Sequence, residues 1–136
     1  MTTIERMLAA RDPLADWARC KDHVGAALAL TNTHTLDDVA QGVAEGRMHF
    51  WPGESSALVT EVHRFPRTSN LHIFLAGGDL DELRAMDPSL ASWGRFLGCS
   101  KLTLAGRPGW ERALKHQGWA KEVVVLSRPI TLEPKQ

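Results

Sequence analysis

The sequence predicts one domain of the α/β class, in the α+β arrangement, with a central mixed and mostly antiparallel sheet flanked by helices. Apolar residues recur at spacings of three and four before Gly46, which is typical of amphipathic helices. After Gly46 the pattern becomes that of strands, in the order strand, strand, strand, helix, strand, helix, strand. A chain of 136 residues also buries enough surface for one core without disulfides or metals.

Residues 1–46 are predicted to form an N-terminal helical part of the same domain. Ile4–Ala10 is a short helix that Asp12-Pro13 interrupts, because the residue before a proline is pushed out of the helical region. Asp12 then caps a second helix that has proline at its first position. A third helix is expected up to Gly46, with Thr35 as its N-cap.

Residues 47–128 are predicted to hold the sheet and its remaining helices. Hydrophobic alternation and turn residues define five strands: Met48–Trp51, Ser56–Phe65, Leu71–Leu75, Lys101–Leu104 and Trp119–Leu126. The β-branched run within the last of these favours a central strand. Residues 129–136 are expected to be a flexible tail, since Pro134 opposes further regular structure.

Two helices are predicted between the later strands. Leu80–Leu97 contains Pro88, which predicts either a kink or two short helices with Asp87 as the new cap. Trp110–Gln117 is a second helix, and Gly118 ends it.

Composition excludes several classes of function. Sixteen basic residues balance sixteen acidic ones, so there is no electrostatic reason to expect nucleic acid or an anionic membrane as partner. Cys20 and Cys99 have no metal-ligand spacing and are predicted to be buried free thiols. No apolar run is long enough to span a bilayer, and the first residues lack the apolar core of a signal peptide. We therefore expect a cytoplasmic protein.

The order of the elements resembles the core of the GNAT N-acetyltransferases. The resemblance includes the glycine-rich segment Ala76–Asp79 between a strand and its helix. It also includes the closing pattern, in which the strand Lys101–Leu104 and the helix Trp110–Gln117 lead to Gly118-Trp119 and a last strand. This resemblance implies a GNAT-like fold over about two-thirds of the chain.

Four segments also resemble small GNAT-like proteins carried by tailed phages and prophages: Trp51–Gly53, Ala57–Glu61, Leu75–Leu83 and Gly106–Arg112. This second resemblance implies a protein encoded by a phage or prophage. It also implies a role as a binding or virion-associated structural component, either in the cytoplasm of the host cell or packaged in a phage particle.

The resemblance to acetyltransferases implies a site for the pyrophosphate of coenzyme A. The matching residues are Leu75, Ala76, Gly77 and Gly78, where glycines would let backbone N–H groups approach a phosphate. The helix that follows begins with Asp79 and Glu82 at the spacing of a capping box, which would occupy those N–H groups. The segment is therefore predicted to stabilise the helix, and no cofactor is expected.

Glu61 and His63 are the candidate catalytic residues if the protein is an enzyme. They share one face of a predicted strand, and either side chain, or His72 on the next strand, could deprotonate an amine. The alternative is that they are exposed residues of a half-solvated sheet. The tyrosine that many GNAT enzymes use as the acid is missing, since the chain contains no tyrosine. His49 lies on a third adjacent strand, so that three histidines could converge on a metal, but no metal site is assigned.

Two hypotheses of different class follow from the sequence. The first is a binding or structural protein whose partner is another protein, from a phage or its host. Trp51 and Trp110 lie beside predicted turns, where a partly exposed indole would suit such a partner. The second is an acetyl-CoA-dependent N-acetyltransferase with an atypical pyrophosphate loop.

Overall fold

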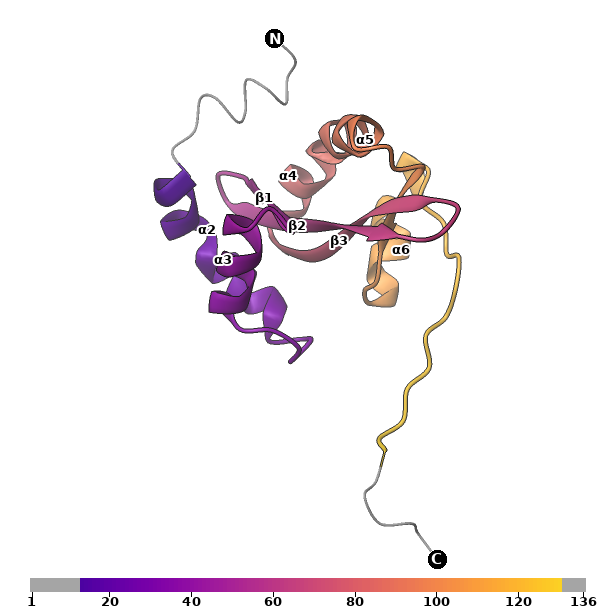
Figure 1. Ribbon diagram of the computed structural model, residues 1–136, viewed down its shortest axis with the longest axis horizontal. Helices are drawn as coiled ribbons and strands as arrows, with labels where there is room; N and C mark the ends of the chain where they lie inside the picture. Colours follow the sequence, from indigo (N-terminus) through magenta and orange to yellow (C-terminus); the bar gives the residue numbers. More distant parts are fainter. Residues whose placement is uncertain (1–12, 131–136) are drawn as a thin grey trace, which may run out of the picture. The chain divides into compact units, whose positions relative to one another are not determined.

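A computed structural model describes residues 13–130 of the chain (Figure 1). The chain divides into two compact units between Ala105 and Gly106. The elements of the first unit are α2 (Pro13–Leu28), α3 (Leu36–Ala44), β1 (Met48–Pro52), β2 (Ser56–Arg64), β3 (Ser69–Gly78), α4 (Leu80–Ala85), α5 (Asp87–Phe96) and β4 (Lys101–Leu104). The second unit contains α6 (Pro108–Leu114) and the 3-10 turn η1 (Lys115–Gln117). The predicted helix Ile4–Ala10 and the cap Asp12 lie outside the described residues.

The four strands form one sheet in the order β1-β2-β3-β4. The pairs β1-β2 and β2-β3 are antiparallel, whereas β4 runs parallel to β3 after the crossover through α4 and α5. Helices α2 and α3 lie on one face of the sheet, and α4 and α5 lie on the other (Figure 1). The predicted mixed and mostly antiparallel sheet, flanked by helices and preceded by N-terminal helices, is confirmed.

Helix boundaries follow the capping residues of the sequence closely. The Thr35 side chain accepts a hydrogen bond from the Asp38 backbone N–H, and the Asp38 carboxylate accepts one from the Thr35 N–H, so α3 begins with a complete capping box. Helices α4 and α5 are separate, as Pro88 predicts, because proline is tolerated only in a first turn. The predicted cap is wrong by one residue: Met86 is the N-cap, and Asp87 lies in the first turn of α5.

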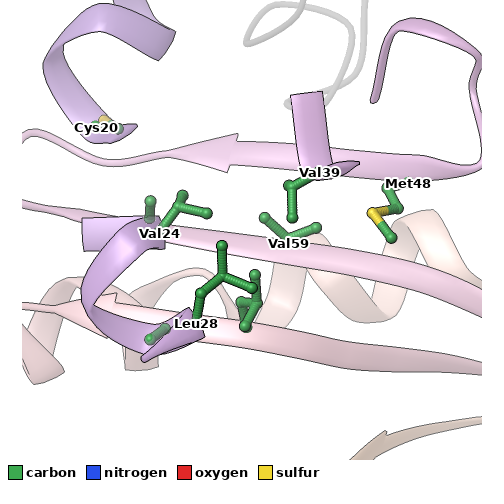
Figure 2. Close-up of a cluster of buried hydrophobic side chains, with 9 residues drawn as sticks. Cys20, Val24, Leu28, Val39, Met48 and Val59 are labelled. Atoms are coloured by element: carbon green, nitrogen blue, oxygen red, sulfur yellow. The ribbon is translucent and has the colours of Figure 1, made fainter. Parts of the chain in front are cut away.

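The main core lies between the sheet and the helices α2 and α3. Figure 2 shows aliphatic side chains from α2, α3, β1 and β2 that converge there, and every member of the cluster is buried. Its members are Cys20, Val24, Ala27, Leu28, Val39, Met48, Ala57, Val59 and Leu75. Full burial of one such valine or leucine side chain contributes about 1.5–3 kcal/mol, so this layer holds α2 and α3 on the sheet.

A bulge in β3 changes which side chains face this core. Val59 pairs with Leu75, but the next residue of β2, Thr60, pairs with Ile73, so that Phe74 has no direct partner. Because alternate residues of a strand share a face, the extra residue puts His72 on the same face as Leu75. Helices α2 and α3 cover this face at the end where Leu75 lies.

Two glycines at the end of β3 allow close packing on both sides. A Cβ atom on Gly77 would lie 2.5 Å from the backbone oxygen of His23 in α2, which is shorter than any real carbon contact. Gly78 has φ of +103°, and its Cβ would collide with the backbone of Ser55 and Ser56. Both positions therefore require glycine for reasons of packing.

The second unit departs from the prediction after its helix. α6 and η1 cover the predicted helix Trp110–Gln117, and Gly118 ends it with a positive φ. The predicted strand Trp119–Leu126 is wrong, because residues 119–130 contain neither helix nor strand. A β-branched run forms a strand only when another strand pairs with it, and no strand of the described chain does so.

Three predictions about burial have mixed outcomes. Cys20 is buried as expected, but Cys99 is partly exposed. Trp51 is buried rather than partly exposed, since its indole N–H donates to Thr60 Oγ1 inside the sheet layer, whereas Trp110 is partly exposed as predicted. Lys101–Leu104 forms the strand β4 as predicted. No helix among residues 13–130 is long and apolar enough to cross a bilayer.

Substitution of Gly77 by alanine tests the close approach of α2 and β3. We expect Gly77→Ala to lower the free energy of unfolding by about 1–3 kcal/mol, because two backbones must move apart to admit the methyl group. Urea unfolding measures this change. Gly25→Ala in α2 is the matched control, since its Cβ would meet Leu36 at an ordinary distance of 3.6 Å and the protein should not lose stability. Equal stabilities of the two variants would contradict the packing role of Gly77.

Candidate functional site

A polar cluster lies on the α2/α3 face of the sheet, beyond the end of the apolar core. Its residues come from three neighbouring strands: Glu61, His63, Asn70, His72 and Thr103. In the β2-β3 register, Glu61 pairs with His72 and His63 pairs with Asn70, so these four side chains share one face. Thr103 joins them because it pairs with His72 across the parallel β3-β4 ladder. The two predicted catalytic residues and His72 are therefore neighbours.

Glu61 and His63 form the acid–base pair of the cluster. The Nε2 atom of His63 lies 2.9 Å from Oε1 of Glu61. Since a carboxylate only accepts hydrogen bonds, the N–H group at Nε2 of His63 donates to Glu61. A histidine oriented in this way by a carboxylate has the arrangement of a general base.

His72 stacks on His63 and is held by Thr103. The two imidazole rings are nearly parallel, with centroids 4.4 Å apart, and Nδ1 of His72 lies 2.8 Å from Oγ1 of Thr103. Burial lowers the pKa of His72, and the neighbouring His63 lowers it further, whereas the charge of Glu61 opposes both effects. His72 is therefore neutral at neutral pH.

Asn70 and Thr103 are members of the cluster that the sequence did not identify. Asn70 is buried, and its Oδ1 atom has no hydrogen-bond partner among the described residues. A buried carbonyl oxygen without a donor is costly, so Asn70 lowers the stability of this part of the sheet. Only the strand register reveals these two residues, because asparagine and threonine are common in strands and turns of any kind.

His49 does not belong to the cluster. It pairs with Thr60, which faces α5, and its ring meets the edge of Trp93 at a centroid distance of 5.6 Å. The possible convergence of three histidines on a metal is therefore wrong, because His49 and the pair His63 and His72 lie on opposite faces. Within residues 13–130, no three side chains of the metal-binding types are placed to share an ion.

The predicted cofactor-binding residues are part of a strand and do not form a loop. Leu75, Ala76, Gly77 and Gly78 continue β3 to its end and pair with β2 through Val59, Leu58, Ala57 and Ser56 respectively. Helix α2 packs against Gly77, and the β1-β2 turn packs against Gly78. A phosphate cradle would require their N–H groups to point at open space in a loop.

The start of α4 is occupied by carboxylates, as the sequence predicted in outline. The Asp79 side chain accepts a hydrogen bond from the Glu82 N–H at 3.0 Å. The reciprocal half of the predicted capping box is wrong, because Glu82 instead binds the β1-β2 turn: its carboxylate accepts from the Ser55 N–H at 2.9 Å and from the Ser56 hydroxyl at 2.7 Å. These hydrogen bonds lower the pKa of Glu82 and keep it ionised.

The residues at this place do not fit the pyrophosphate of coenzyme A. Asp79 donates its own N–H to the Ser55 carbonyl, and the Glu82 N–H is used by the cap. Asp79, Asp81 and Glu82 also bring three carboxylates to one helix turn, where an anionic ligand would be repelled. The described residues thus include the Glu61–His63 pair, whereas the start of α4 does not form a phosphate site.

No protein-family model and no curated protein sequence matches the chain. Solved structures do match it. Glucosamine-6-phosphate N-acetyltransferase from Arabidopsis thaliana has a TM-score of 0.65 at 12% identity, with 89% of this chain and 96% of that chain covered. The protein TTHA1254 from Thermus thermophilus gives 0.61 at 17% identity, with coverages of 89% and 94%. An acetyltransferase from Trypanosoma brucei gives 0.59 at 15% identity, with coverages of 83% and 94%. The fold is therefore GNAT-like, and identities this low concern the fold alone.

Removal of the α4 cap tests the role of Asp79. We expect Asp79→Ala to lower the free energy of unfolding by about 1 kcal/mol, because the Glu82 N–H loses its partner. The control is Asp81→Ala in the same turn, whose carboxylate makes only an exposed ion pair of 3.7 Å with Arg84 and should cost less than about 0.5 kcal/mol. Thermal melting of both variants measures the difference, and an unchanged melting temperature for Asp79→Ala would refute the cap.

The titration of His72 tests the environment of the cluster. Its pKa lies below the usual value of about 6.5, so between these two values the unfolded chain binds more protons than the folded protein. The free energy of unfolding should therefore fall as the pH falls below about 6.5, and His72→Gln should reduce this slope. The ring proton shifts of His72 in an NMR titration give the pKa directly. A midpoint of His72 above that of a free histidine would contradict the prediction.

Proposed function

We propose that this protein is a binding protein built on the GNAT fold, and that it does not act as an efficient acetyltransferase. The proposal rests on the conformation and packing of the segment between Leu75 and Glu82. In an acetyltransferase this place holds the pyrophosphate of the acyl donor, whereas here it consists of a paired strand, two tightly packed glycines and a carboxylate-capped helix. A ligand that carries several negative charges has neither donors nor room there.

The proposed partner is another protein, from a phage or from its host, and the role is that of a binding or virion-associated component. The resemblance of four segments to phage-carried proteins supports this origin. Exposed aromatic surface supports the mode of action. Phe96 on α5 is 77% exposed and stacks on Trp93 at a centroid distance of 5.4 Å, and aromatic side chains of this kind are enriched in protein interfaces.

Acetyl-CoA-dependent N-acetylation is a second candidate function, and the Glu61–His63 pair favours it. With Nε2 hydrogen-bonded to Glu61, Nδ1 of His63 could take the proton of an amine. Two of the solved structures that share the fold are acetyltransferases. This candidate requires a donor site other than the start of α4.

Calorimetric titration with acetyl-CoA and with CoA separates the two candidates. We expect no heat of binding up to millimolar ligand, because the carboxylates at the start of α4 repel the pyrophosphate. Gly77 and Gly78 are also covered by other parts of the protein. An acetyltransferase of the same fold, titrated under the same conditions, is the positive control. Binding in the micromolar range would refute the proposal. In that case, loss of acetylation in His63→Ala with unchanged binding would establish the second candidate.

A further inference from the structure

The charged residues of this chain are balanced in number but not in position. Two long segments of the first unit contain no acidic residue: residues 62–78, which include the β2-β3 turn, and residues 88–104, which include most of α5 and all of β4. The same segments contribute the cations Arg64, Arg67, Arg95 and Lys101. A net charge of zero for the whole chain therefore does not describe this part of the surface.

Arg64 and Arg67 lie at the turn between β2 and β3. The turn is closed by the Phe65 N–H, which donates to the Thr68 carbonyl at 2.8 Å. Both arginines are exposed, and among residues 13–130 neither forms an ion pair with a carboxylate. Their guanidinium groups are therefore open to an anionic ligand.

The end of α5 and the start of β4 lie beside this turn. The Ser100 N–H donates to the Ser69 carbonyl at 2.9 Å, and Lys101 follows as the first residue of β4. Burial raises the pKa of the Cys99 thiol, whereas the positive charge of Arg64 lowers it, so these two side chains are close in space. All of these contacts lie within the first unit.

The last turn of α5 adds a third exposed arginine and an aromatic stack. Arg95 pairs with no carboxylate of the described chain, and Phe96 follows it as the last residue of the helix. The Phe96 ring stacks on the Trp93 ring, with an angle of 21° between the ring planes and a centroid distance of 5.4 Å. Phe96 is 77% exposed, whereas Trp93 is partly buried, so the stack ends with one ring face open to solvent.

We propose that the basic end of the first unit, formed by Arg64, Arg67, Arg95 and Phe96, binds single-stranded nucleic acid without sequence preference. The three arginines bind phosphates, and Phe96 stacks on a base. Arginine binds phosphate through a planar fork of N–H donors, and an aromatic ring stacks on any base because every base has a π-face. The inference goes beyond the proposed function, because it gives the protein a ligand other than a partner protein.

An acidic protein segment is the other polyanion that fits three arginines. A nucleotide combines a phosphate with a flat base, so each nucleotide of a single strand supplies partners for both the arginines and the open ring of Phe96. A protein segment does so only where its sequence places carboxylates beside an aromatic side chain. In a duplex the bases stack on each other, so their faces are closed to Phe96. A single strand is therefore the ligand that the basic end fits best.

The acidic start of α4 does not oppose this ligand. It follows the far end of β3, which has 10 residues and spans about 30 Å at about 3.3 Å per residue. The Debye length is about 8 Å at physiological ionic strength, so charges at the two ends of β3 are screened from each other.

Fluorescence anisotropy of a labelled deoxythymidine oligomer of about 12 nucleotides tests this proposal with the full chain. We expect a dissociation constant of about 1–100 μM near physiological salt, and tighter binding at low salt, because bound phosphates release their counterions. Each phosphate contact of a single strand contributes about −0.7 to the slope of log affinity against log salt concentration. Three arginines therefore predict a slope of about −2.

The variant Arg64→Gln/Arg67→Gln should weaken binding at least about tenfold at low salt and bring the slope to about −0.7, the value for one contact. Both positions are exposed, so its circular dichroism spectrum should not change. The matched control is Arg47→Gln/Arg84→Gln, which removes the same charge from arginines that lie elsewhere in the first unit and already pair with carboxylates. This control should keep the slope of the unaltered chain.

Phe96→Leu should weaken binding at least about fivefold without a change of slope, because it removes the stacked ring and no charge. Phe96→Trp keeps an aromatic ring at the same position and should bind the oligomer at least as tightly as the unaltered chain.

Constant anisotropy up to millimolar protein at low salt would overturn the proposal, and so would equal slopes for the two arginine variants. A glutamate peptide that displaces the oligomer as well as unlabelled oligomer does, and binds Phe96→Leu equally well, would also overturn it, because the basic end would then serve an acidic protein segment. These outcomes do not depend on acetyl-CoA, so the calorimetric titration tests the proposed function separately.

Discussion

Strand β3 and helix α2 are in direct backbone contact at Gly77, and the packing of the first unit depends on this contact. Any side chain at Gly77 would collide with the backbone oxygen of His23, so glycine fixes how deeply α2 lies on the sheet. With α2 at this depth, its apolar side chains reach Val59 and Leu75 and close the main core. The end of β3 is paired with β2 up to Gly78, and only the N-cap Asp79 separates the strand from α4.

The glycines of this segment thus have a different physical role from the one that the family resemblance implies. In a phosphate loop, glycine lets a ligand approach the backbone, whereas Gly77 and Gly78 let other parts of the protein approach it. Glu82 reinforces this arrangement, because its carboxylate ties the start of α4 to Ser55 and Ser56. The sequence predicted the acidic cap correctly, but the partner of Glu82 lies 27 residues away in the chain, and no local spacing indicates it.

Part of the candidate site could not be predicted from the sequence, again because it depends on the pairing of segments that lie far apart in the chain. Glu61 and His63 are two residues apart in one strand, so the period of a strand is sufficient to put them on one face. The addition of His72 depends on the bulge at Phe74, without which the ring would point to the opposite face. Asn70 and Thr103 depend in turn on the pairing of β3 with both neighbours. A bulge leaves no mark in hydrophobic alternation, because its extra residue here is an ordinary apolar one.

The incorrect prediction of a strand over Trp119–Leu126 came from its run of β-branched residues, Val123, Val124 and Val125. Local propensity describes what a segment favours when a partner is present, and this run favours a paired strand. In the described chain β1 to β4 form the one sheet, with β1 and β4 as its edge strands, and residues 119–130 are not part of it. The run therefore has a preference for the strand conformation but forms no strand.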